Sequence, residues 1–204
     1  MTTDDILTRK RYNRIAFLYD LMEAPMERLR FAKWRQMVLD RVKGHRVLEV
    51  GVGTGKNLRY YPNDIEITAV DLSPRMLRRA RRQNEMLGMD ARLMEMDVQK
   101  LAFQDNCFDT VVATFVFCSV PDPVEGLKEL HRVCKPDGRL FAIEHVRPSN
   151  WALGVVFDAL NPFVVSMMGA NINRLTLDNI QTAGWKILAA KKLSSDIVWS
   201  IEAV

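Results

Sequence analysis

Three glycines at alternate positions, Gly51, Gly53 and Gly55, constrain the fold of this 204-residue chain more than any other feature. They follow the stretch 47–50, which is mostly apolar and partly β-branched, as expected for a strand buried on both faces of a parallel sheet. Glycine permits positive φ and a close approach of a ligand to the backbone. The pattern predicts a strand, a glycine-rich turn and a helix start whose N–H groups can bind a small polar ligand.

An acidic residue at the end of the next predicted strand strengthens this interpretation. Asp71 closes the stretch 65–71 and lies twenty residues after Gly51, where a ribose-binding acid is found in nucleotide-binding βαβ units. The glycines are not spaced as in the dinucleotide fingerprint, which has two residues before its last glycine. A tight turn in some other α/β protein is the alternative interpretation.

The pattern Glu-x-Gly-x-Gly-x-Gly from Glu49, followed by the acid Asp71, resembles the class I S-adenosylmethionine-dependent methyltransferases. The likeness extends over about residues 46 to 146. It implies an α/β, Rossmann-like fold with a seven-stranded, mostly parallel sheet, helices on both faces and N-terminal lid helices. It also implies S-adenosylmethionine as the cofactor, with Glu49 fixing the turn or reaching the methionine amino group.

The resemblance assigns a part of the cofactor to each strand end. Gly51 and Gly53 would contact the methionine part, and Asp71 would bind the ribose hydroxyl groups. Asp97 and Val98 would hold the adenine. The full expected cofactor site is Tyr12, Tyr19, Glu49, Gly51, Gly53, Gly55, Asp71, Leu72, Met76, Asp97, Val98 and Thr114.

Two basic, amphipathic helices are predicted before the first strand, from about Leu7 to Leu21 and from about Met26 to Val42. In the methyltransferases that this chain resembles, a Tyr-x6-Tyr-Asp segment folds over the cofactor as a lid, and Tyr12 and Tyr19 match it. A tyrosine offers a π face to a sulfonium and a hydroxyl group to the methyl acceptor. An aromatic residue packed beneath a helix is the alternative.

The chain length suits one domain with small additions. We expect residues 1–42 to form lid and membrane-facing helices, residues 43–204 to form the methyltransferase domain, and about 147–183 to form an insertion that covers the substrate. The stretch 151–168 is long and apolar, but polar residues and a proline interrupt it. It therefore predicts an interfacial or substrate-cover helix, not a transmembrane helix.

Cysteine content and charge indicate the compartment and the class of partner. The three cysteines form no CxxC pair, which argues against a disulfide framework or a metal site and favours a reducing cytosol. The polar, acidic first residues do not predict a signal peptide. A net charge of +4 favours an anionic partner, either nucleic acid or a membrane surface. We expect no obligate protein partner.

The acceptor is indicated by the segments beyond the cofactor motifs. Amino-directed DNA methyltransferases carry an Asp/Asn-Pro-Pro-aromatic motif after the fourth strand, and residues 115–120 lack it. Nucleic acid is therefore not the expected substrate. Residues 114–123, 144–148, 160–162 and 169–174 instead resemble the small soluble bacterial phosphatidylethanolamine N-methyltransferases. These are similar to the quinone C-methyltransferases, so a quinone or another small-molecule C- or O-acceptor is the alternative, and a module that binds the cofactor without turnover is a third.

The resemblance implies methylation of phosphatidylethanolamine towards phosphatidylcholine, by a cytoplasmic enzyme peripherally bound to the inner face of the cell membrane. A protonated amine has no lone pair, so a proton must leave before the nitrogen can accept a methyl group. The candidates to accept or relay that proton are Tyr19, Glu144 and His145. The candidates to bind the phosphate and headgroup are Arg147, Asn171 and Arg174. A strand-end histidine with a structural role and solvated surface arginines are the alternatives.

Overall fold

The computed structural model describes residues 3–204, apart from the side chains of residues 3, 15, 17–23, 167 and 168. The strands are β1 (Arg46–Val50), β2 (Glu66–Asp71), β3 (Arg92–Glu95), β4 (Phe108–Thr114), β5 (Cys134–His145), β6 (Ile187–Ser194) and β7 (Val198–Ala203). The helices are α1 (Thr3–Met26), α2 (Ala32–Leu39), α3 (Pro74–Leu87), α4 (Pro123–Val133), α5 (Trp151–Met168) and α6 (Thr176–Thr182). The π-helix η1 (Glu27–Phe31) joins α1 to α2, and η2 (Leu58–Tyr60) is a single 3-10 turn.

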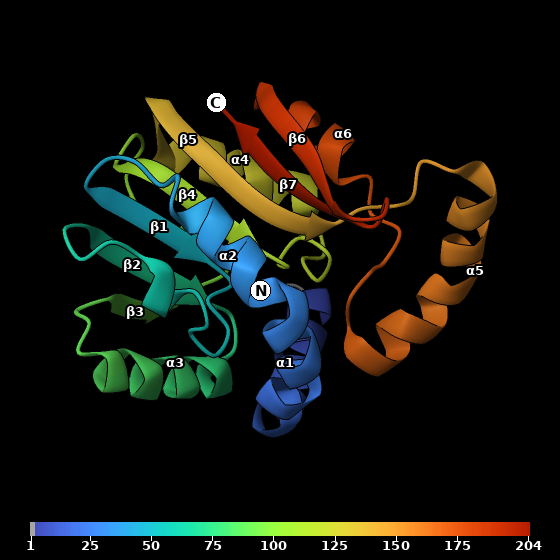
Figure 1. Cartoon of the computed structure of the whole chain (residues 1–204), viewed down its shortest axis with the longest axis horizontal. Coiled ribbons are helices and arrows are strands. Elements are labelled where there is room, and N and C mark those ends of the chain that lie inside the picture. The colour runs from blue at the N-terminus through green and yellow to red at the C-terminus, as the bar shows by residue number, and fades with distance from the viewer. Residues whose placement is uncertain (1–2) are drawn as a thin grey trace.

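The strands form one seven-stranded sheet in the order β3-β2-β1-β4-β5-β7-β6 (Figure 1). Strands β1 to β5 pair in parallel, whereas β7 runs antiparallel to both of its neighbours, β5 and β6. The α/β, mostly parallel fold predicted from the sequence is confirmed. The carboxyl ends of the parallel strands meet at one edge, where ligands bind in sheets of this kind.

Helices cover both faces of the sheet, because successive strand side chains point to opposite faces. Val47 of β1 packs on one face with Leu39 of α2 and Leu77 of α3. The next residue, Leu48, packs on the other face with Leu127 of α4. Burial on both sides explains why the central strands are nearly continuous apolar runs in the sequence.

The N-terminal helices do not separate where the sequence suggested. Met26 and Phe31 both keep right-handed helical φ and ψ, so α1, η1 and α2 follow one another directly. Pro25 lies inside α1, where it removes one hydrogen bond without ending the helix. The two predicted N-terminal helices are present as α1 and α2, but η1 joins them without a break and both boundaries differ from those expected.

Two element boundaries near the expected site also differ from the prediction. The stretch 56–61, which ends before Pro62, predicts a short helix, but only the turn η2 forms there, because the chain is already extended at Tyr61. The apolar run 109–117 predicts a fourth strand that reaches Phe117, but β4 ends at Thr114, because Phe115 has a φ of 59° and turns the chain away from the sheet. Both predicted boundaries are therefore wrong, because no glycine marks the change in backbone conformation at Tyr61 or at Phe115.

The apolar stretch 151–168 is helical as expected, and forms α5 at the edge of the molecule, beyond the end of β5 (Figure 1). Asn150 caps its start by accepting a hydrogen bond from the N–H of Leu153. Gly169, in the left-handed region, ends it. Within the described part of the chain, no helix is long and apolar enough to cross a membrane.

Candidate active site

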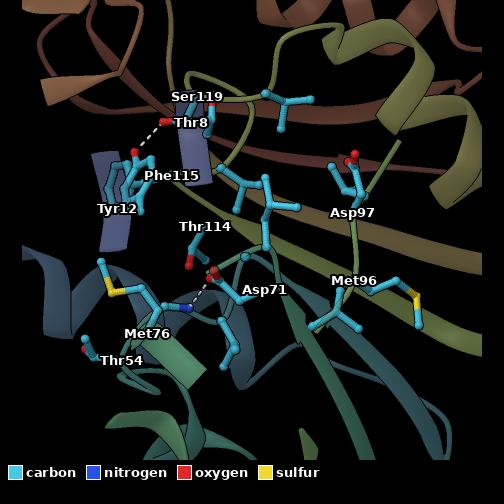
Figure 2. Close-up of a pocket in the computed structure, with 18 of the residues that line it drawn as sticks. Thr8, Tyr12, Thr54, Asp71, Met76, Met96, Asp97, Thr114, Phe115 and Ser119 are labelled. Carbon is cyan, nitrogen blue, oxygen red and sulfur yellow. Dashed lines mark hydrogen bonds between the residues drawn. The ribbon is translucent and has the colours of Figure 1, made fainter. Parts of the chain in front are cut away.

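A cavity that is partly open to solvent lies at the carboxyl ends of β1, β2 and β4 (Figure 2). Nine residues of the expected cofactor site line it: Tyr12, Gly51, Gly53, Asp71, Leu72, Met76, Asp97, Val98 and Thr114. The fold therefore gathers these residues from several separate segments around one space.

Asp71 holds the glycine turn in place. Its Oδ2 accepts a 2.8 Å hydrogen bond from the N–H of Gly53, and its Oδ1 accepts one of 2.8 Å from the N–H of Ser73. Burial raises the pKa of this carboxyl group to about 6. Gly51 has positive φ, and a Cβ there would lie 2.5 Å from a methyl group of Val116. The turn can therefore approach the cavity only with glycine at this position.

A buried polar network lies behind the turn. Glu49 accepts a 2.9 Å hydrogen bond from Asn57 Nδ2, which also donates to Thr114 Oγ1 at 3.0 Å. Arg35 of α2 donates to Asn57 Oδ1 and to Thr114 Oγ1, each at 2.9 Å. Burial raises the pKa of Glu49 to about 7. Glu49 does not line the cavity. Its position is consistent with fixing the turn and not with direct contact to the methionine amino group.

Gly55 also lies outside the cavity wall. A Cβ on this residue would be 3.1 Å from the Cα of Ala80 in α3. The glycine therefore serves the packing of the turn against the helix.

Gln99, which lines the cavity, connects Asp97 to helix α1. Gln99 donates to Asp97 Oδ1 through its backbone N–H at 2.9 Å and through Nε2 at 3.1 Å. The same Nε2 donates at 2.8 Å to Asp5 of α1, which is buried. Asp97 is thus fixed at the cavity wall, and the start of α1 is tied to it.

Helix α1 lies over the cavity as a lid would. The hydroxyl groups of Tyr12 and Ser119 are hydrogen-bonded across the opening (Figure 2). The neighbouring Asn13 accepts from Ser73 Oγ at 2.8 Å and from the N–H of Arg75 at 3.2 Å. The side chain of Tyr19, the second expected lid tyrosine, lies outside the described residues.

Comparisons with known proteins agree with this geometry. The family described as "Methyltransferase domain" matches residues 48–142. A demethylmenaquinone methyltransferase of Thermus thermophilus is 32% identical over 170 residues, which are 78% of this chain and 77% of that protein. The chain belongs to the class I S-adenosylmethionine-dependent methyltransferases.

Two further relatives define the range of similarity. A phosphatidylethanolamine N-methyltransferase of Cereibacter sphaeroides is 41% identical over 123 residues, 59% of this chain and 61% of that protein, which is less than two thirds of its length. A SAM-dependent methyltransferase of Thermotoga maritima has the same fold, with a TM-score of 0.71, 22% identity and coverage of 95% of this chain and 98% of that one.

The residues of the methyltransferase cavity fit S-adenosylmethionine, the methyl donor of this class. A Cβ on Gly53 would meet no atom closer than 3.9 Å, so the turn leaves open space for a ligand beside its backbone. Asp71 keeps acceptor lone pairs beyond its two backbone contacts for ribose hydroxyl groups. Asp97 and Val98, which are expected to hold the adenine, line the same cavity. When bound, the cofactor supplies an electrophilic methyl group on a sulfonium.

The two strand-end candidates for proton transfer lie outside the cavity wall. Glu144 is fully buried, and its Oε1 accepts from the N–H groups of Val116 at 2.8 Å and Phe117 at 3.1 Å. Burial raises the pKa of Glu144 to about 8. The ring of His145 lies 5.0 Å from the ring of Phe115. Both residues thus support the loop after β4, and the expected direct contact of either with the substrate does not match this placement.

The three expected substrate-binding residues bind other parts of the chain. Arg147 forms a 2.8 Å ion pair with Asp158 of α5. Asn171 donates at 3.0 Å to the carbonyl oxygen of Cys118, and Arg174 donates at 2.7 Å to that of Val120. None of the three lines the cavity. Together they join α5 and the turn after it to the loop that follows β4.

Sequence reasoning missed several residues of the cavity wall: Thr8, Arg35, Thr54, Lys56, Gln99, Phe115 and Ser119. One signal was available for Arg35, because it lies in the apolar stripe of α2 beside Trp34 and Val38, all of which are buried. A cation within such a stripe indicates a buried polar partner. No sequence signal marks Phe115, whose positive φ is rare for an aromatic residue.

Proposed function

We propose that this methyltransferase methylates the amine nitrogen of phosphatidylethanolamine, towards phosphatidylcholine, while bound to the cytoplasmic surface of a membrane. The observation that carries the proposal is an exposed apolar helix tied to the acceptor end of the cavity. In α5, the side chains of Trp151 and Phe163 are 77% and 66% exposed. Such side chains suit the interface between lipid headgroups and acyl chains.

Hydrogen bonds of two asparagines connect α5 to the loop beside the cavity. Asn161 of α5 donates at 3.1 Å to Asn171 Oδ1, and Asn171 donates to the carbonyl oxygen of Cys118. The next residue, Ser119, lines the cavity. A lipid whose acyl chains lie along α5 therefore has a short path for its headgroup to the opening.

Basic residues provide the second part of the expected membrane contact. Exposed cations on α1, η1 and the start of α2 are Lys10, Arg14, Arg28, Arg30 and Lys33. Each cation close to an anionic leaflet adds about 1 kcal/mol of attraction, which salt weakens. The likeness of the chain to a phosphatidylethanolamine N-methyltransferase supports the same acceptor.

The chemistry needs a neutral amine aligned with the donor methyl group. An alkylammonium with a pKa near 10 is mostly protonated at pH 7, and burial away from water lowers that pKa. The nitrogen then uses its lone pair to bond the methyl carbon as the carbon–sulfur bond breaks and its electron pair stays on sulfur. The hydroxyl groups of Tyr12 and Ser119 are the polar groups at this opening that can hold the amine or pass on its proton.

A quinone is the second candidate acceptor, supported by the likeness to a demethylmenaquinone methyltransferase. A prenylated quinone is also apolar, so α5 does not separate the two. The test is to incubate the purified protein with labelled S-adenosylmethionine and vesicles that contain both phosphatidylethanolamine and demethylmenaquinone. Label in the monomethylated phospholipid supports the proposal. Label only in menaquinone overturns it, and so does binding of the cofactor with no product from either lipid.

A further inference from the structure

Two cationic side chains, Arg35 and Lys56, line the cofactor cavity among the described residues. Lys56 directly follows the glycine turn, close to Thr54, and both residues line the cavity. Figure 2 shows Thr54 and Asp97 on opposite sides of Asp71. Because Asp97 marks the adenine end and Asp71 the ribose position, Lys56 belongs to the end where the methionine part of the cofactor would lie.

A carboxylate of the chain itself already occupies the space between these cations. Glu27 Oε2 lies 3.3 Å from Arg35 Nε and 4.0 Å from Lys56 Nζ. Glu27 is part of the π-helix η1, and such turns often occur at functional sites. Glu27 itself does not line the cofactor cavity, so its carboxylate pairs with the two cations from outside that cavity and leaves their inner sides to face it.

The two cations differ in how firmly they are held. Arg35 is fixed in the buried network, since it donates to Asn57 and Thr114 as well as to Glu27. Lys56 has a flexible four-carbon stem, and its side chain is 18% exposed. Lys56 can therefore turn from the Glu27 carboxylate towards a second carboxylate in the cavity.

We propose that Lys56 binds the carboxylate of the methionine part of S-adenosylmethionine. That carboxylate enters a part-buried cavity, where an unpaired charge is costly, and Lys56 is the cation there that can follow it. The inference concerns the methyl donor, so it does not depend on which lipid accepts the methyl group.

An anion on the far side of Lys56 is the competing explanation. A second cavity shares Thr54 and Lys56 with the first and is also lined by Arg28 and Arg59. A phosphate diester of an acceptor lipid could bind there. The experiment must therefore separate the carboxylate of the cofactor from the phosphate of the lipid.

The test compares two ligands that differ only in the carboxylate, S-adenosylmethionine and decarboxylated S-adenosylmethionine, by calorimetry without any lipid. Lys56→Gln should weaken binding of S-adenosylmethionine by about ten- to hundredfold, the range for a lost charged hydrogen bond. It should leave the decarboxylated ligand within about twofold of the unaltered protein. Lys56→Arg should recover most of the loss. The matched control is Arg59→Gln, which removes a charge from the second cavity alone and should change neither affinity.

Three outcomes overturn the proposal. Equal weakening of both ligands by Lys56→Gln, with an unchanged circular dichroism spectrum, would make Lys56 a support of the turn and not a carboxylate ligand. Unchanged affinity for both, together with a higher KM for phosphatidylethanolamine, would assign Lys56 to the lipid phosphate. An equal loss in the Arg59→Gln control would mean that overall charge, and not this contact, sets the affinity.

Discussion

The carboxylate of Glu144 accepts a 2.8 Å hydrogen bond from the backbone N–H of Val116. This contact joins the end of β5 to the loop after β4, which carries Phe115 and Ser119 into the cavity wall. The second oxygen of Glu144 is buried and has no hydrogen-bond partner among the described residues. The acid thus supports this part of the cavity wall from behind.

Two substitutions of Glu144 should distinguish the effect of its hydrogen bonds on stability from the effect of its ionisation. Burial raises the pKa of Glu144 from 4.5 to about 8, so between these values the folded state binds more protons than the unfolded state. The contribution of protonated Glu144 to the free energy of unfolding is complete below about pH 4.5 and is lost as the pH rises through 8. Glu144→Gln keeps the acceptor oxygen and cannot ionise. Its unfolding midpoint in urea should therefore fall less between pH 6 and pH 9 than that of the unaltered protein.

Glu144→Ala is the matched variant that removes the acceptor as well. It leaves the N–H groups of Val116 and Phe117 without their partner, at a cost of about 1–3 kcal/mol for each buried donor. The urea midpoint should then be lower at both pH values, and the pH slope should resemble that of Glu144→Gln. A pH slope in Glu144→Gln equal to that of the unaltered protein would show that Glu144 does not titrate in this range.

Asp71 should make cofactor binding depend on pH. Its pKa is raised by burial to about 6, and protonation removes acceptor capacity that ribose hydroxyl groups need. The affinity for S-adenosylhomocysteine should be constant above about pH 7 and should fall as the pH drops through 6. Asp71→Asn should weaken binding by about tenfold or more at pH 7.5 and should remove the pH dependence. Titration calorimetry at pH 5, 6 and 7.5 measures both effects.

The exposed acid Asp90 provides the control for this experiment. Asp90→Asn changes the net charge by the same amount as Asp71→Asn, but Asp90 does not line the cavity. It should leave both the affinity and its pH dependence unaltered. If Asp71→Asn retained the pH dependence of the unaltered protein, another group would be responsible for it.

The fold and the cofactor loop were predictable because short-range patterns encode them. Gly51 and Gly53 need positive φ, and Asp71 lies at the end of the next strand, so both can be located from neighbouring residues. The acceptor side was not predictable in this way. Glu144 and Arg147 occur at a strand end in the sequence, but their partners, Val116 and Asp158, lie 28 and 11 residues away.

A sequence shows that a charged residue reaches the edge of a sheet, but not which way its side chain points. Glu144 points into the protein, and Arg147 points to α5. The reversal at Phe115 decides which residues after β4 face the cavity, and it has no local signal, since the position is not glycine. Long-range contacts of this kind need the three-dimensional arrangement.

The exposed aromatic residues of α5, Trp151 and Phe163, should determine binding to vesicles. Replacing both Trp151 and Phe163 by serine should lower the affinity for vesicles of mixed phosphatidylethanolamine and phosphatidylglycerol by about tenfold or more, since burying each large apolar side chain is worth about 1.5–3 kcal/mol. Folding should be unaffected, because both side chains are largely exposed. Met86→Ser, at a residue of α3 that is 75% exposed, is the control and should bind as before. Flotation assays at low and high salt measure binding, and an unchanged affinity in the double variant would exclude α5 as the contact.

The hydroxyl group of Tyr12 should act on the acceptor and not only in closing the lid. Tyr12→Phe and Ser119→Ala both remove the hydrogen bond between these two residues, but only the first removes the tyrosine hydroxyl group. If that group holds the amine or relays its proton, Tyr12→Phe should lower kcat by about tenfold or more, whereas Ser119→Ala should lower it by less than about threefold. Binding of S-adenosylhomocysteine, measured by calorimetry, should change little in either variant. Equal losses of kcat would instead show that catalysis depends on the hydrogen bond between Tyr12 and Ser119. Both variants lose this bond, and with it the contact that closes the lid.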